Sequence, residues 1–169
     1  MKIPIRSYFI FDGDTLNCTS SLGEQFKTRA AWIDAPEIGH GEAPPNAIAS
    51  NQWAWGQTSK DYLRSLLSGK HLLITPIGTD QYDRRLAFWF ASATLPVRTS
   101  LASCIQVQMI AAGMAVDFFP YQNLERLSNS EVTLFCRILR EQQKAHRNRR
   151  GFWADPDFIR PSEYRRSQI

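Results

Sequence analysis

Three acidic side chains near the start of the chain could bind a divalent cation and activate a water molecule. Asp14 lies in a short acidic stretch with a glycine, and Asp34 and Glu37 flank an alanine–proline pair. All three offer only oxygen ligands, which Ca²⁺ and Mg²⁺ prefer, whereas zinc prefers histidine and cysteine. Two carboxylates would leave coordination positions for water and a substrate phosphate. That open arrangement suits catalysis better than structural binding.

Two arginines add the groups that phosphate chemistry needs. The planar guanidinium forks of Arg29 and Arg84 match phosphate oxygens and can stabilise the charge that builds up during nucleophilic attack. A carboxylate such as Glu37 can take the proton of the attacking water, which typically contributes ~10²–10⁴-fold to the rate. The combination predicts phosphodiester hydrolysis. Taken singly, Asp14 could belong to a hairpin turn, Asp34 to a strand exit, and Glu37 could only order water around the ion.

Five segments have the composition of β-strands that could position these residues. They are rich in β-branched and aromatic side chains, and Gly23 supplies a turn between the second and the third. The predicted strands cover residues 3–11, 16–19, 25–33, 70–77 and 85–90.

Three helices are predicted between and after the strands. Residues 58–68 have helical periodicity, and Gly69 is a good C-terminal stop. A short helix is expected over 105–112. A capping box at 128–131 precedes a third helix, whose apolar stripe is Val132, Phe135, Ile138 and Leu139. By its glycine and proline content, 39–51 is a loop.

This order of elements favours a small barrel covered by helices over a parallel sheet. The fold class is therefore predicted as α+β, mainly a β barrel. A length of 169 residues with 43% apolar content fits one domain over residues 1–169. No segment approaches the ~20 apolar residues that a membrane span requires, so no membrane partner is expected.

The net charge of +4 fits a polyanionic partner. The odd number of cysteines, Cys18, Cys104 and Cys136, without paired spacing, predicts buried apolar side chains rather than disulfides or a zinc site. The chain reaches Asp12 too early to contain a signal peptide. It is therefore cytoplasmic as written, or secreted or periplasmic if a leader has been removed.

A series of short motifs occurs in one order along the chain. They are Phe11-Asp12-Gly13-Asp14-Thr15-Leu16, Arg29, Ile33-Asp34-Ala35-Pro36-Glu37, Gly56-Gln57, Leu66-Leu67-Ser68-Gly69-Lys70, Asp80-Gln81-Tyr82-Asp83-Arg84-Arg85-Leu86-Ala87, Ala112-Gly113-Met114-Ala115 and Gly151-Phe152-Trp153. Together they resemble the staphylococcal nuclease (thermonuclease) family over roughly residues 8–154, with 155–169 left as a C-terminal tail. The resemblance implies a five-stranded OB-fold barrel with three helices. It also implies a calcium-dependent nuclease that cuts DNA and RNA and leaves 3′-phosphates. A monomer is expected.

The resemblance also implies roles for the acidic residues. Asp14 and Asp34 match the family's metal ligands, and the carbonyl of Ala35 matches its backbone ligand. Glu37 matches the residue that is usually assigned as the general base.

Arginines and tyrosines carry over in the same way. Arg29 and Arg84 match the phosphate-binding arginines, and the motif register selects Arg84 over its neighbour Arg85. Tyr82 and Tyr121 match aromatic positions near the bound nucleotide, although packing at the rim explains them equally well. Because stacking tolerates any base and is typically worth ~1–3 kcal/mol, single strands are the expected better substrate.

The chain departs from the family pattern at several positions. Asp83 stands where a glycine is usual, and Asp is among the less costly replacements if the turn needs positive φ. Gln81 replaces a frequent basic residue, and Phe119 replaces a frequent tyrosine. The stretch 39–55 is long and unusual in composition. A non-catalytic module that binds nucleic acid or protein is the alternative function, because the same fold can bind without cutting.

Overall fold

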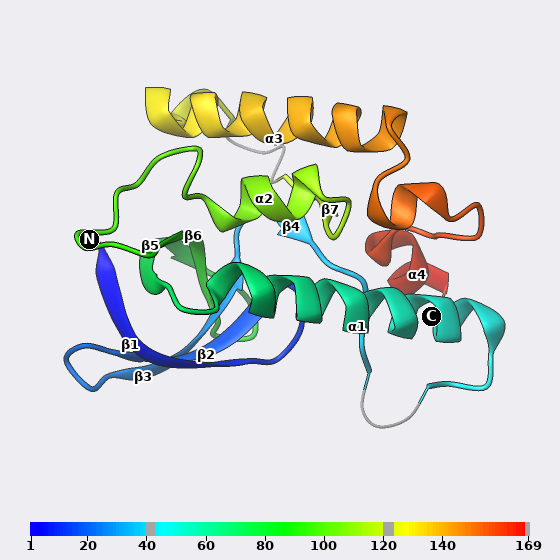
Figure 1. The fold of residues 1–169 in the computed structure, drawn as a ribbon, viewed down its shortest axis with the longest axis horizontal. Coiled ribbons are helices and arrows are strands. Elements are labelled where there is room, and N and C mark those ends of the chain that lie inside the picture. The colour runs from blue at the N-terminus through cyan, green and yellow to red at the C-terminus, as the bar shows by residue number, and fades with distance from the viewer. Residues whose placement is uncertain (40–42, 120–123, 168–169) are drawn as a thin grey trace.

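Five strands form a closed barrel. They are β1 (Ile3–Ile10), β2 (Thr15–Ser20), β3 (Gln25–Ala30), β5 (His71–Thr79) and β6 (Arg85–Ser92). The structure, a computed structural model, describes residues 1–39, 43–119 and 124–167. The barrel order is β1-β2-β3-β6-β5, and every neighbouring pair is antiparallel except β3 and β6 (Figure 1). The α+β class with a five-stranded barrel is therefore confirmed.

The described residues form four α-helices, one more than the sequence predicted. The helices are α1 (Ala47–Leu67), α2 (Ile105–Ala111), α3 (Asn129–Arg147) and α4 (Pro161–Ser167), with two 3₁₀ helices, η1 (Leu124–Arg126) and η2 (Gly151–Ala154). In Figure 1, α2 lies between α1 and α3, and α4 lies by the N-terminal end of α1. None of the described helices is long and apolar enough to cross a membrane.

The largest error of the sequence prediction concerns the start of α1. Residues 47–51 were predicted as loop and 58–68 as helix, but α1 already begins at Ala47. The side chain of Asn46 caps it by accepting hydrogen bonds from the backbone N–H groups of Ile48 and Ala49. The prolines that suggested a loop lie just before this cap. We call residues 47–57 the α1 extension.

A sharp bend after β3 directs the chain from the barrel into the site. The segment predicted as one strand, 25–33, is broken at Trp32, whose φ is +68°. Such a backbone costs roughly 1–2 kcal/mol for a residue other than glycine. The Trp32 ring is buried and meets the edge of Phe88 at 4.7 Å, and this packing offsets the strain. The chain then forms β4 (Ile33–Asp34), which pairs antiparallel with β7 (Val116–Asp117).

A buried glutamine attaches α2 to the barrel. The Gln106 side chain donates to the Ala87 carbonyl at 2.8 Å and accepts from the Trp89 backbone N–H at 3.1 Å. The indole of Trp89 in turn donates to Thr28 on β3. Because every polar group of this network has a partner, it fixes the helix on the barrel without an unsatisfied buried atom.

The third predicted helix starts where the sequence placed it. The capping box between Ser128 and Glu131 is present, and Ile138 is fully buried as predicted. Val132 is exposed instead, because the buried stripe passes through Leu134. Cys136, on the same helix, is also exposed, so the prediction of a buried side chain was wrong there; Cys18 and Cys104 are buried and all three thiols are free.

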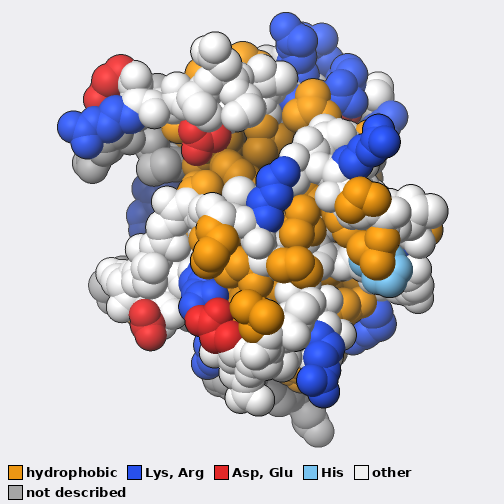
Figure 2. Space-filling model, turned by 90° about the vertical axis from the view of Figure 1, so that its left-hand side faces the viewer, with side chains coloured by type: hydrophobic (Ala, Val, Ile, Leu, Met, Phe, Trp, Pro, Cys, Tyr) orange, Lys and Arg blue, Asp and Glu red, His pale blue; other side chains and the backbone are white. Residues whose placement is uncertain are grey.

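One face of the molecule shows how the surface charge is distributed. Figure 2 shows apolar side chains over its centre, with Lys and Arg side chains in separate groups around them. On this face the positive charge does not form the continuous stripe that would follow a nucleic-acid backbone.

Candidate active site

The acidic residues of the site come from two neighbouring turns of the chain. Asp14 ends the turn between β1 and β2, and Asp34 ends β4. The backbone N–H of Ala35 donates to Asp14 Oδ2 at 3.0 Å, which joins the two turns. Gly13 permits this approach, because a Cβ there would lie 2.8 Å from the Ala35 Cβ and 2.1 Å from Ser59 Oγ. The ligand role of the Ala35 carbonyl stays a prediction.

A buried arginine holds the two aspartates together. Nη2 of Arg29, on β3, lies 3.1 Å from Asp14 Oδ2 and 2.6 Å from Asp34 Oδ1. Both carboxylates are almost fully buried, with side chains 4% and 1% exposed. Burial alone would lower the pKa of Arg29, but the charges of Asp14 and Asp34 outweigh it. The pKa is therefore raised, and the guanidinium stays charged.

Asp12 is a second carboxyl beside Asp14 that the sequence analysis treated only as part of a turn. It accepts the backbone N–H of Asp14 at 2.9 Å. Burial and the negative charge of Asp14 raise the pKa of Asp12 to about 8. The opposing hydrogen bonds from Asp14 and Thr15 are too weak to reverse this shift.

Arg84 is oriented by an acid that the sequence analysis did not single out. Asp80 accepts from Arg84 Nε at 2.8 Å and contacts its Nη2 at 2.7 Å. Burial would raise the pKa of Asp80, but hydrogen bonds from Arg84 and Tyr82 outweigh it and lower the pKa. The remaining nitrogen, Nη1, lies 3.4 Å from the hydroxyl of Thr15, which itself donates to Asp14. Arg84 is therefore linked to Asp14 through the hydroxyl of Thr15.

Asp83 has the backbone conformation that glycine favours, with φ of +59°. We expect Asp83→Val to lower the free energy of unfolding by about 1–2 kcal/mol, because a β-branched side chain is poorly tolerated there, whereas Asp83→Gly should be at least as stable as the wild type. Urea unfolding midpoints measure the effect. Gln81→Val, on the exposed turn of the same hairpin, is the control and should change stability by less than about 0.5 kcal/mol. An Asp83→Val variant as stable as this control would contradict the expectation.

Glu37 lies beside the two aspartates but is not free. Its Oε1 accepts from Nη1 of Arg165 on α4 at 2.5 Å. The same guanidinium forms two hydrogen bonds with Asp34, from Nη1 to Oδ1 at 3.1 Å and from Nη2 to Oδ2 at 2.7 Å. Burial would lower the pKa of Arg165, but the bonds and charges of Asp34 and Glu37 raise it.

Arg165 is the arginine of this site that could not be selected from the sequence. It lies in the segment 155–169, which was treated as a tail outside the motifs. Arg160 and Arg166 are equally basic neighbours, so composition gave no signal to select Arg165. Only the fold shows that it reaches the acids.

Helix α1 supports the backbone that carries the glutamate. A Cβ on Gly56 would lie 2.8 Å from the carbonyl oxygens of both Pro36 and Glu37, so only glycine lets the helix approach this closely. The helix thereby fixes the segment between Asp34 and Glu37.

The aromatic positions are less closely tied to the cluster. Tyr82 is 69% exposed, and its ring lies 5.3 Å from the Arg84 guanidinium carbon. Tyr121 lies outside the described residues. Phe119 is buried and packs on Phe135 at 4.1 Å between ring centroids, so it belongs to the core.

The side chains present fit a hard cation in type, because both aspartates offer only oxygen ligands. Asp14 and Asp34 reach the same nitrogen of Arg29, so their carboxylates face one small volume. Within the described ranges, no group of three or more His, Cys, Asp or Glu side chains could hold a metal ion by itself. Water and a phosphate oxygen would therefore have to complete the coordination, as expected for a catalytic ion.

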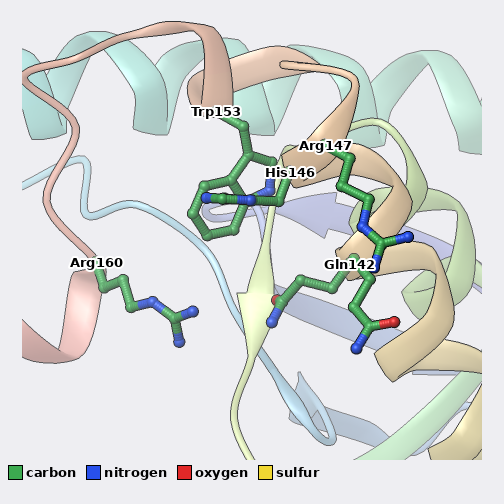
Figure 3. A pocket seen from close by; sticks show the side chains of 6 residues that line it. Gln142, His146, Arg147, Trp153 and Arg160 are labelled. Carbon is green, nitrogen blue, oxygen red and sulfur yellow. The ribbon is translucent and has the colours of Figure 1, made fainter.

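A hollow of about 270 Å³ lies elsewhere, between α3 and the segment after η2. Figure 3 shows His146 facing Trp153 at its wall, with Arg147 and Arg160 projecting from opposite sides. None of the acids described above lines it, so we assign it no part in the chemistry.

The chain is similar in sequence to one protein family and to several named proteins. The model of the family described as "Staphylococcal nuclease homologue" matches residues 27–155. An uncharacterised endonuclease of Haemophilus influenzae is 30% identical over 167 residues, which cover 99% of this chain and 75% of that protein. A micrococcal nuclease of Shigella flexneri is 25% identical over 158 residues, covering 94% and 78%. Protein ParB of Escherichia coli is 27% identical over 157 residues, covering 93% and 76%.

Proposed function

Since the chain belongs to the staphylococcal nuclease homologue family and is a nuclease, we propose that it hydrolyses DNA and RNA with the help of a bound calcium ion. The observation that supports this most directly is the convergence of Asp14, Asp34 and Glu37 with Arg29 at one edge of the barrel. Held by Asp14, Asp34 and the Ala35 carbonyl, the ion would act as a Lewis acid on a phosphate oxygen.

The protein's own side chains perform the remaining steps. Arg29 and Arg84 bind the scissile phosphate and stabilise the charge that develops on its oxygens. Glu37 takes a proton from a water placed for in-line attack on phosphorus. The bond to the 5′ oxygen breaks, and the product keeps a 3′-phosphate. Single strands are the preferred substrate, because exposed aromatic side chains such as Tyr82 can stack on unpaired bases.

Removal of calcium tests this proposal. We expect cleavage of a single-stranded DNA oligonucleotide to stop when a calcium chelator is added and to return with excess Ca²⁺. The products should resist polymerase extension until a phosphatase removes the 3′-phosphate. Cleavage that continues in chelator would contradict the role of the cation, and products that extend directly would contradict the proposed bond.

A further inference from the structure

The segment that carries Arg165 is attached to the α1 extension by polar contacts. Asp155 Oδ2 accepts from the side chains of Asn51 at 2.8 Å and Trp55 at 2.6 Å. Farther along, the side chain of Gln52 donates to the backbone carbonyl of Ile159. These contacts join residues about a hundred positions apart in the sequence, and they fix the position of α4. We call this attachment of the segment to the α1 extension the seat of α4.

Apolar packing supports the same seat. The rings of Phe152 and Phe158 stack with centroids 4.0 Å apart and planes at 9°. Pro161, the first residue of α4, is buried. The chain between η2 and α4 is therefore held at both ends, and the last turn of α4 points Arg165 at the acids.

Arg165 occupies the positions on Asp34 that a cation would use. Oδ2 of Asp34 accepts from Arg165, and Oδ1 accepts from both Arg29 and Arg165. Calcium binds carboxylate oxygens at 2.3–2.6 Å, whereas the Arg165 nitrogens already lie 2.7 and 3.1 Å from these oxygens. A cation and the Arg165 guanidinium compete for this space, because both would contact the same two oxygens of Asp34 and their like charges repel.

Arg165 is also the arginine that can leave. Arg29 is 16% exposed and fixed in a barrel strand, whereas the Arg165 side chain is 39% exposed on a helix of seven residues. Helices this short have little stability of their own and open locally at low cost.

We propose that Arg165 is a built-in competitor of the catalytic cation, so that α4 closes the site until a cation displaces it. This inference rests on the proposed function, in which Asp34 holds the ion and Glu37 is the base. Because the same guanidinium contacts both acids, its departure frees the cation ligand and the base together. Binding linkage is reciprocal: if α4 weakens cation binding, the cation must loosen α4 to the same extent.

Calcium binding to the full chain, measured by titration calorimetry, tests the competition. Arg165→Gln should bind Ca²⁺ about tenfold more tightly than the wild type, within the usual 5–150-fold range of coupling between sites. Arg166→Gln is the matched control, since it removes the same charge one residue away and its Nε contacts only the Ser162 carbonyl among the described residues. The control should change affinity by less than about threefold. Equal affinities in the three proteins, or no calcium binding in any of them, would overturn the proposal.

Amide hydrogen exchange gives a second readout that does not depend on activity. Calcium should speed exchange at residues 162–167 of the wild type and leave the rate unchanged in Arg165→Gln. Asp155→Ala, which keeps Arg165 but removes the seat of the segment, should also tighten calcium binding. If calcium slows exchange in α4 or leaves it unchanged in the wild type, the proposal is wrong.

The two proposals can fail separately. A protein that binds calcium and releases α4 but cuts no nucleic acid would refute the proposed function and support the role of Arg165. A protein whose cleavage depends on calcium while α4 exchange stays constant would refute the role of Arg165 and keep the function.

Discussion

Glu37→Gln is expected to lower the rate of cleavage by about 10²–10⁴-fold at saturating calcium. The amide has almost the same shape as the carboxylate but cannot take a proton from the attacking water. Single-turnover cleavage of a single-stranded oligonucleotide measures the effect on the chemical step, since product release does not contribute. Substrate binding should change little, because Glu37 is not among the phosphate-binding groups.

Glu163→Gln is the control for this variant. Glu163 lies on α4 and is exposed. Its replacement by glutamine removes the same charge as Glu37→Gln without changing a residue of the acidic site. Its rate should stay within about twofold of the wild type. A Glu37→Gln protein that cut within a fewfold of the wild type would show that Glu37 orders water around the ion and is not the base.

Arg84→Lys should reduce cleavage by about 10²–10³-fold, the usual loss when one donor to a developing oxyanion is removed. Lysine keeps the charge but has no planar fork, so it cannot be held by Asp80 and face the phosphate at once. Single-turnover rates at saturating substrate measure the loss.

Arg85→Lys is the control for Arg84→Lys. Arg85 follows directly in the chain, yet it pairs with Glu24 and covers the ring of Phe26 at 4.1 Å, away from the acids. Its cleavage rate should be unchanged. Equal losses in the two variants would mean that charge near the hairpin matters and not the geometry of Arg84, and that the choice of Arg84 from the motif register was unfounded.

Local patterns predicted the parts of the molecule that local forces determine. The β-branched and aromatic composition of the barrel strands and the capping box at Ser128 are local features, and both could be used for prediction. The same holds for the expectation that Asp83 would tolerate a positive φ, which it has. The start of α1 was missed because the prolines at 44 and 45 dominated the composition, although Asn46 was a usable cap signal.

The active site was only partly accessible from sequence for a related reason. The acids and the two arginines lie within short motifs, so the resemblance located them. Arg165 meets Asp34 across 131 positions and Glu37 across 128. A contact of this kind depends on how α4 is seated on α1, and no periodicity or spacing in the chain encodes that seat.

The seat of α4 also bears on how such chains diversify. The family match ends at residue 155, before α4, whereas the α1 extension lies inside it. Asn51 and Trp55 use their donors on Asp155, so each segment would leave polar atoms of the other without partners if it were lost alone. The two segments should therefore be kept or lost together. Relatives with a short first helix should also lack the arginine-bearing segment, and their acids should be open to cations at all times.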